Sequence, residues 1–136
     1  SPSDYPAHAV AAITTHDLPT LAGFPLGRDI EARKSAGLMD DAAYSAQWAA
    51  RHEDRQKLEQ ALRDAGFPDD PAGFLLSTPC VLAVVNQEDL SGETEQQNLP
   101  GSTWQYPNWR RKMRVPVEAM APLAARFAGA VKGSGR

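Results

Sequence analysis

The sequence has little of what marks a secreted, disulfide-stabilised or membrane-spanning protein. Cys80 is the only cysteine among 136 residues, so no intramolecular disulfide can form and a reducing compartment is expected. The sequence contains no glycosylation sequon, no apolar segment typical of a secretory leader and no apolar run long enough to cross a membrane. These absences predict a cytoplasmic protein that does not bind membranes.

Strong charge and the common cofactor motifs are also missing. The net charge of −3 gives no overall attraction for the phosphates of nucleic acids or for anionic lipids. The three histidines and Cys80 lack the spacing of metal ligands, and there is no glycine-rich phosphate loop or G-x-S-x-G motif. We therefore expect no metal, no nucleic-acid partner, and a Cys80 that packs rather than reacts.

What the chain does contain is typical of a globular domain. Apolar residues make up 42% of the sequence and charged residues 23%. A chain of 136 residues can bury a sizeable core, so residues 1–136 are expected to form a single segment. The chain begins with Ser1 rather than methionine, which suggests an excised piece or removal of the methionine.

Two short apolar runs, residues 9–13 and 81–85, predict β-strands. Neither run alternates with polar residues, which is typical of strands buried on both faces in a parallel sheet. A buried helical turn is the alternative for the alanine-rich first run. Each run ends in a polar cluster, residues 14–17 and 86–89, where parallel α/β folds place their ligands.

Helices are predicted between and after these strands. A short helix is expected over residues 28–36, a long one over 41–65 and another short one over 69–76, each bounded by capping residues, glycine or proline. The charged stretch from Arg51 to Lys57 predicts that the middle of the long helix is solvated. Residues 18–26 and 92–101 are expected to be loops.

The C-terminal region is expected to be a broken helix followed by a frayed tail. Pro116 suits the first turn of a helix, and Pro122 is expected to break it. Residues 132–136 are glycine-rich. The order of strand, helices, strand and helices predicts a βαβ unit. Two strands cannot close a barrel, so the unit should be part of a larger architecture.

His16 and Asp17, after the first strand, are the first candidate site. A carboxylate there can accept hydroxyl groups of a polyol or stabilise a positively charged transition state, and the imidazole can donate a hydrogen bond. The alternative is that Asp17 caps the following turn and His16 pairs with the backbone.

Glu88 and Asp89, after the second strand, are a candidate carboxylate pair of the kind used in glycoside chemistry, with Glu93 and Glu95 further along. Adjacent residues at a strand end point to opposite sides, however, and acidic loops are usually solvated. The sequence does not support assigning catalytic roles to either residue.

Three aromatic residues near the C-terminus lie next to a basic stretch. They could stack on nucleic-acid bases, pack on the faces of sugars, or anchor a helix in the core. An RNA-binding module is the least favoured of these, because the chain is acidic overall and has no nucleic-acid motif. The residues are Trp104, Tyr106, Trp109, Arg110, Arg111, Lys112 and Arg114.

Several blocks together resemble the C-terminal segment of the 4-alpha-glucanotransferases, also called amylomaltases or disproportionating enzymes. Residues 12–23 resemble that family's ATHDLPTLxGxW region, and residues 84–93 resemble VQLEDLLGE. Residues 98–101 with 106–111 resemble NLPGT followed by PNWRRK. The blocks stand in the family's order. The chain departs from the family pattern at Pro25, Asn86 and Gln87.

The resemblance implies an α/β fold: the C-terminal β-α-β-α portion of a TIM-type (β/α)8 barrel, helix-rich as an isolated chain. It implies retaining transfer of α-1,4-glucan segments between maltooligosaccharides, without a metal or organic cofactor. Asp17 would be the carboxylate that stabilises the transition state, and His16 would bind the donor sugar beside it. Asn98, Pro100 and Gly101 would lie near the donor sugar.

The family's catalytic nucleophile and acid/base residue lie upstream of the matched blocks. We therefore expect this chain to be a fragment that is inactive alone and whose partner is the missing N-terminal part of the barrel. The alternative is a non-catalytic domain that binds oligosaccharides or a partner, including a homo-oligomer formed through exposed strand edges.

Overall fold

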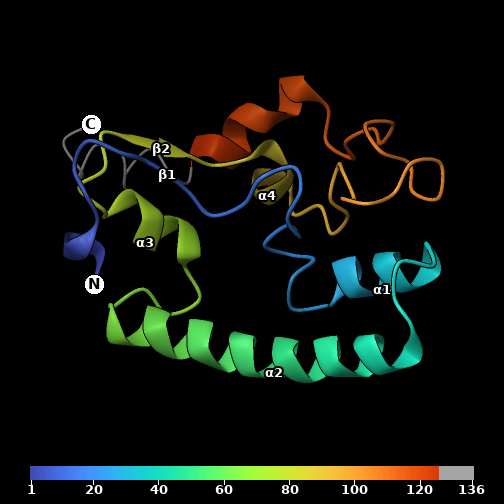
Figure 1. Ribbon diagram of the computed structural model, residues 1–136. Helices are drawn as coiled ribbons and strands as arrows, with labels where there is room; N and C mark the ends of the chain where they lie inside the picture. The colour runs from blue at the N-terminus through green and yellow to red at the C-terminus, as the bar shows by residue number, and fades with distance from the viewer. Residues whose placement is uncertain (126–136) are drawn as a thin grey trace.

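The computed structural model describes residues 1–125 as a small α/β unit with more helix than strand (Figure 1). Two strands, β1 (Val10–Ala12) and β2 (Leu82–Val84), form a two-stranded sheet. Three helices lie between them in the chain, namely α1 (Arg28–Ser35), α2 (Asp41–Asp64) and α3 (Pro71–Leu76). The expected frayed tail at 132–136 lies outside the described residues.

The strands pair in parallel, as the βαβ prediction requires. Val10 is opposite Leu82, Ala11 opposite Ala83 and Ala12 opposite Val84. Both predicted strands are therefore confirmed, although each is shorter than its apolar run. The parallel pairing also brings the carboxyl ends of β1 and β2, and the polar residues that follow them, to the same edge of the sheet.

The expectation that both faces of the strands are buried is wrong. On one face, Ala11 packs with Leu75 of α3 and with Cys80, which is 1% exposed. On the other face, the side chains of Val10, Leu82 and Val84 remain exposed. Among the described elements only α3 contributes to the core cluster of this sheet, so residues 1–125 leave the second face exposed.

The long and short helices begin and end where their capping residues predict. Asp40 accepts a hydrogen bond from Ala43 N at 2.7 Å and so caps α2. Gly66, with φ of 82°, ends this helix, and Phe67 N donates to Leu62 O at 2.8 Å, as in a Schellman motif. Asp70 caps α3 by accepting from Gly73 N at 2.8 Å.

Three short helices are less visible in the sequence. The first is η1 (Pro2–Asp4), the second is α4 (Gln87–Ser91), which contains the polar residues after β2, and the third is η2 (Val117–Ala119). Residues 120–125 continue as helix after η2. Pro122 therefore does not break the helix. It lies in the first helical turn, where the absence of an N–H group costs no hydrogen bond.

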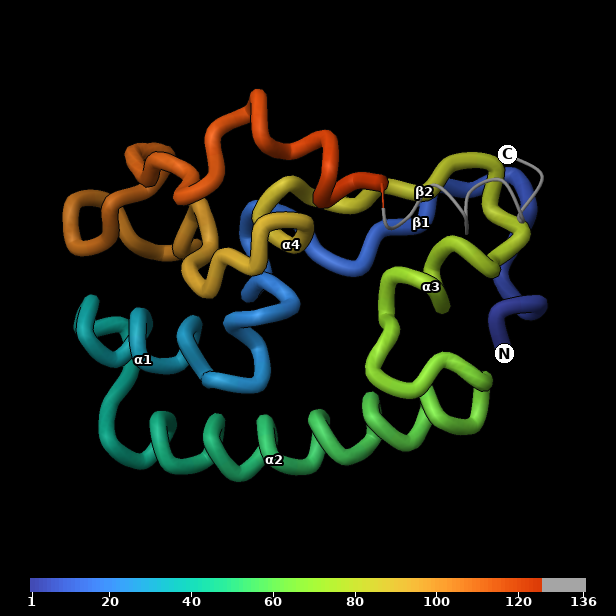
Figure 2. The backbone as a smooth tube through the Cα atoms, turned by 180° about the vertical axis from the view of Figure 1, so that it is seen from behind, coloured from blue at the N-terminus to red at the C-terminus, as the bar shows by residue number. Residues whose placement is uncertain are grey.

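Helix α2 runs the length of the molecule, with α1 at one end and α3 at the other (Figures 1 and 2). The charged middle of this helix is mostly exposed, as expected, but Arg51 at its start is buried. Its guanidinium makes two hydrogen bonds with the Asp29 carboxylate, of 2.9 and 2.8 Å, and donates to Phe24 O at 2.7 Å. The sequence shows that Arg51 is charged, but it does not show that Asp29 is its partner.

Substituting Gly27 with alanine should lower the free energy of unfolding by about 2–5 kcal/mol. Gly27 caps α1 with φ of 62°, and a Cβ there would overlap the Trp48 ring of α2. The left-handed conformation costs an alanine roughly 1–2 kcal/mol, and overpacking adds about 1–3 kcal/mol. Urea unfolding of the 136-residue chain measures the change.

Gly37→Ala is the matched control for this variant. Gly37 also has a positive φ, of 72°, but a Cβ there would meet no atom within 4 Å. It should therefore show only the backbone cost of about 1–2 kcal/mol. Equal losses in the two variants would mean that contact with Trp48 does not require glycine at position 27.

Candidate functional site

The polar residues after β1 form a cluster with the loop that follows α4. His16 and Asp17 side chains are 55% and 45% exposed, and His16 Nε2 lies 3.4 Å from Asp17 Oδ2. Asn98 Nδ2 donates to Asp17 Oδ1 at 2.6 Å, and Asn98 N donates to His16 O at 3.0 Å. Three of the predicted site residues therefore meet, although 81 positions separate Asp17 from Asn98.

Pro100 and Gly101 have a different place in this site. They are exposed at the tip of a turn in which Ser102 N donates to Leu99 O at 3.1 Å. Proline at the second position and glycine at the third, with φ of 86°, are the residues that a type II turn favours. Leu99 is fully buried and anchors the turn. In this geometry Pro100 and Gly101 shape the segment that presents Asn98.

The three aromatic residues after this turn have different environments. Trp104 is 81% exposed, whereas Tyr106 is buried. Trp109 is 63% exposed, and its ring centroid lies 4.9 Å from that of His16. Its φ of 59° is unusual for a bulky side chain, and such conformations are often found at functional sites. Trp109 therefore places an exposed aromatic face beside His16 and Asp17.

Gln96 is a member of the cluster that the sequence did not single out. It is 4% exposed, and its Nε2 donates to Asn98 O at 2.6 Å and to Asp17 O at 3.3 Å. Tyr106 donates its hydroxyl to Gln96 O at 2.7 Å. Burial raises the pKa of Tyr106 above its usual value, although Arg111 opposes this, so the hydroxyl stays protonated as a donor.

The carboxylate pair considered after β2 does not form a second site of this kind. Asp89 is buried and accepts hydrogen bonds from the Thr14 hydroxyl and from Leu21 N, the latter at 2.7 Å. Asn86 Nδ2 also donates to Thr14, at 2.8 Å to O and 2.7 Å to Oγ1. Asp89 therefore joins α4 to the end of β1 and to the loop after it.

The expectation that the acidic loop is only solvated is wrong, and the basic stretch is not free either. Glu95 forms ion pairs with Arg28 and Arg111, and Arg114 pairs with Glu93 at 3.2 Å. The acidic and basic segments therefore partly neutralise each other. This arrangement removes much of the positive charge that a phosphate backbone would need.

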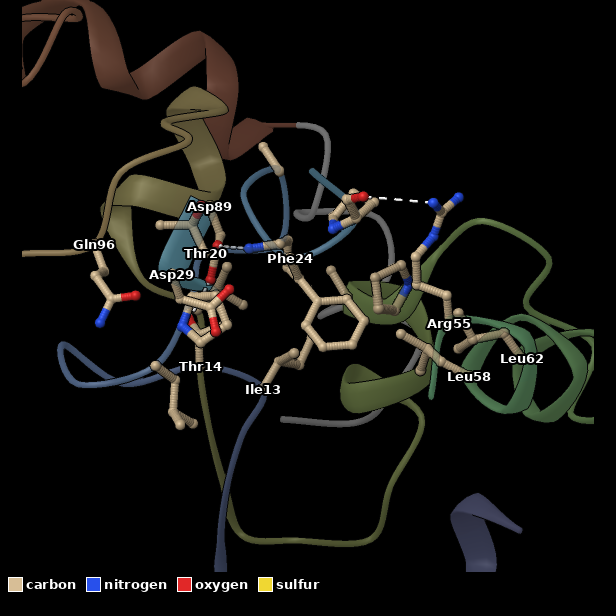
Figure 3. A pocket seen from close by; sticks show the side chains of 18 of the residues that line it. Ile13, Thr14, Thr20, Phe24, Asp29, Arg55, Leu58, Leu62, Asp89 and Gln96 are labelled. Carbon is tan, nitrogen blue, oxygen red and sulfur yellow. Dashed lines mark hydrogen bonds between the residues drawn. The ribbon is translucent and has the colours of Figure 1, made fainter. Parts of the chain in front are cut away.

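A cavity of about 1120 Å³ lies between α2 and the carboxyl ends of the strands (Figure 3). Apolar side chains such as Ile13, Phe24 and Leu62 line it, together with charged ones such as Asp29 and Arg55. Asp17, Asp89 and Gln96 also line this space. The candidate carboxylate therefore borders both solvent and a large hollow.

Residues 1–125 show neither a candidate metal site nor a candidate membrane-spanning helix. This region holds no group of three or more His, Cys, Asp or Glu side chains arranged to bind a metal ion. None of its helices combines the length and the apolar character that crossing a membrane requires.

Comparisons with known proteins support the resemblance seen in the sequence. The family model described as 4-alpha-glucanotransferase matches residues 1–118. The 4-alpha-glucanotransferase of Mycobacterium tuberculosis H37Rv is 33% identical over 121 residues, covering 80% of this chain and 17% of that protein. The enzyme of the same name from Haemophilus influenzae is 30% identical over 133 residues, covering 85% of this chain and 19% of that protein.

The backbone is also similar to a solved structure, that of amylomaltase from Corynebacterium glutamicum. The TM-score is 0.79 at 28% sequence identity, over 95% of this chain and 22% of that one. This chain thus spans less than a quarter of each of these relatives. Because the family model covers most of its length, the chain belongs to the 4-alpha-glucanotransferase family.

Proposed function

We propose that this chain supplies the donor-sugar side of a retaining 4-alpha-glucanotransferase that transfers α-1,4-glucan segments between maltooligosaccharides. The observation that supports this proposal most directly is the geometry of Asp17. Its carboxylate is half exposed, lies at the end of a parallel strand and is held by Asn98 and His16.

Asp17 acts as the stabiliser of the transition state. Glycoside transfer passes through a state resembling an oxocarbenium ion, and a fixed carboxylate nearby lowers the energy of that positive charge. Asn98 and His16 hold Asp17 before the sugar arrives, so little reorganisation is needed. The exposed part of the carboxylate remains available to accept sugar hydroxyls, and Trp109 offers an aromatic face beside it.

The remainder of the enzyme supplies the other two carboxylates. Retaining transfer requires a nucleophile and a general acid/base. Within residues 1–125, three of the carboxylates that follow β2 have partners of another kind: Asp89 accepts buried hydrogen bonds, and Glu93 and Glu95 pair with arginines. The chain alone is therefore inactive, and its partner is the part of the barrel that it lacks.

A chimera tests this proposal. Residues 1–118 replace the segment of Corynebacterium glutamicum amylomaltase on which they superpose, and the chimera is incubated with maltotriose. We expect glucose and longer maltodextrins from the chimera, and neither product from the 136-residue chain alone. A folded but inactive chimera would contradict the proposed role. Transfer by the chain alone would contradict the claim that the remainder of the enzyme supplies the nucleophile and the general acid/base.

The non-catalytic alternative has one specific observation in its favour. Exposed Trp109, His16 and Asp17 lie together within this chain alone, so an oligosaccharide could bind without the rest of a barrel. Binding of maltotriose without turnover, together with an inactive chimera, would favour this role. Self-association through the open edges of the two-stranded sheet belongs to the same alternative.

A further inference from the structure

The side chain of Gln96 joins two loops that come from different strands. Its Nε2 donates to the carbonyl oxygens of Asn98, at 2.6 Å, and Asp17, at 3.3 Å. Asp17 follows β1, whereas Asn98 lies beyond β2 and α4. One buried amide nitrogen therefore holds the backbone of the candidate carboxylate and the backbone of the residue that contacts it.

Gln96 is itself held in place. The backbone carbonyl oxygen of Gln96 accepts a hydrogen bond from the Tyr106 hydroxyl at 2.7 Å, and both residues are about 95% buried. The two backbone contacts of Gln96 lie beside the hydrogen bond from Asn98 Nδ2 to Asp17 Oδ1. Figure 3 shows Gln96 across the cavity from Arg55 and Leu58, on the side of Thr14. Its contacts converge on the two residues that face the substrate.

We propose that Gln96 is a positioning residue that sets the orientation of the Asp17 carboxylate and the Asn98 carboxamide. The proposal rests on the proposed function, because orientation affects turnover only if Asp17 faces the reacting sugar. The hydrogen bond of Gln96 to Asp17 is to the backbone oxygen rather than to the carboxylate. A misplacement of about 1 Å at such a site can lower turnover by roughly 100-fold.

The chemistry of glutamine suits this place. A single amide nitrogen carries two hydrogens and can donate to both carbonyl groups at once. A glutamate at this position would place its carboxylate oxygens, which only accept hydrogen bonds, against the carbonyl oxygens of Asp17 and Asn98. A methionine of similar length would leave both carbonyl groups without this donor while keeping much of the volume.

Gln96→Met in the 136-residue chain is the test, with Gln97→Met as the matched control. The Gln97 side chain donates only a weak contact of 3.8 Å to the Met113 sulfur. The NMR signals of the Asn98 side-chain amide report its hydrogen bond to Asp17. In Gln96→Met we expect the hydrogen-exchange rate of the Asn98 side-chain amide to rise at least tenfold. Its chemical shift should approach that of an exposed asparagine. In Gln97→Met both should stay unchanged.

In the chimera, Gln96→Met should lower kcat about 10- to 100-fold with KM changed less than about twofold, and Gln97→Met should leave both unchanged. A folded Gln96→Met chain with unchanged Asn98 signals would overturn the proposal. An inactive unsubstituted chimera would defeat the proposed function, whereas the NMR comparison would still decide whether Gln96 orients Asn98.

Tyr106→Phe keeps the test decisive if Gln96→Met does not fold. This variant removes only the hydroxyl that holds the Gln96 backbone. The exchange of the Asn98 amide should rise in the same direction by a smaller factor, of about 2 to 5. No change in a folded Tyr106→Phe chain would overturn the proposal.

Discussion

Asp17→Asn should lower kcat of the chimera about 100- to 1000-fold. Asparagine keeps the size of the side chain but removes the negative charge, and loss of one preorganised electrostatic stabiliser typically has an effect of this size. The Asn98 amide would also lose its charged acceptor, which now lies 2.6 Å away. Initial rates of glucose release from maltotriose measure kcat and KM.

Glu88→Gln is the matched control, because it also neutralises one carboxylate after a strand. Glu88 was the other half of the carboxylate pair considered from the sequence, and it lies one residue from buried Asp89 in α4. We expect less than a twofold change in kcat. Comparable losses in the two variants would mean that general loss of negative charge, rather than the position of Asp17, lowers the rate.

Arg51→Met should lower the free energy of unfolding by about 3–5 kcal/mol, which is typical when one partner of a buried ion pair is removed. Arg51 and Asp29 side chains are 10% and 12% exposed and are joined by two hydrogen bonds. The Arg51 guanidinium also lies 4.1 Å from the centre of the Phe24 ring. The variant would leave Asp29 buried without this partner. Urea unfolding monitored by circular dichroism measures the loss.

Arg55→Met, one turn further along α2, is the control for that variant. The Arg55 side chain is 43% exposed, lies 3.7 Å from Glu59 and reaches Pro25 O at 3.4 Å. Exposed pairs of this kind contribute about 0–1 kcal/mol, so little change is expected. Adding Asp29→Asn to Arg51→Met should restore part of the stability. If Arg51→Met costs no more than Arg55→Met, the buried pair does not stabilise this fold.

The parts of the fold that the sequence predicted correctly depend on local signals. Asp40 and Gly66 bound the long helix because each acts on backbone groups within a few residues of itself. Asp70 followed by proline starts α3 for the same reason. The apolar runs predicted both strands, and the resemblance brought His16, Asp17 and Asn98 into one candidate site.

The parts that were wrong or missed depend on distant partners. The sequence shows Arg51 among charges, but its burial follows from Asp29 and Phe24, which lie on another helix and loop. Glu95 looked solvated because the arginines that pair with it are 67 and 16 positions away, at Arg28 and Arg111. The exposure of one sheet face within residues 1–125 likewise depends on which other elements pack against it, and no residue pattern within the strands shows that.

Gln96 was missed because its contacts are set by three-dimensional placement. A glutamine in an amide-rich loop has no distinctive pattern, and its partners are backbone carbonyls, which every residue carries. The only long-range clue was indirect: the resemblance placed Asn98 near Asp17, and Gln96 is two residues from Asn98.

The parallel pairing of β1 with β2 has a consequence for the time course of folding. The hydrogen bonds that join the two strand ends connect residues 72 to 81 positions apart, such as Thr14 with Asn86 and Asp17 with Asn98. Helix α2 forms from contacts four residues apart, whereas these long loops must close before any of their bonds is gained. We therefore expect the corner that holds His16, Asp17 and Asn98 to assemble after α2 has formed.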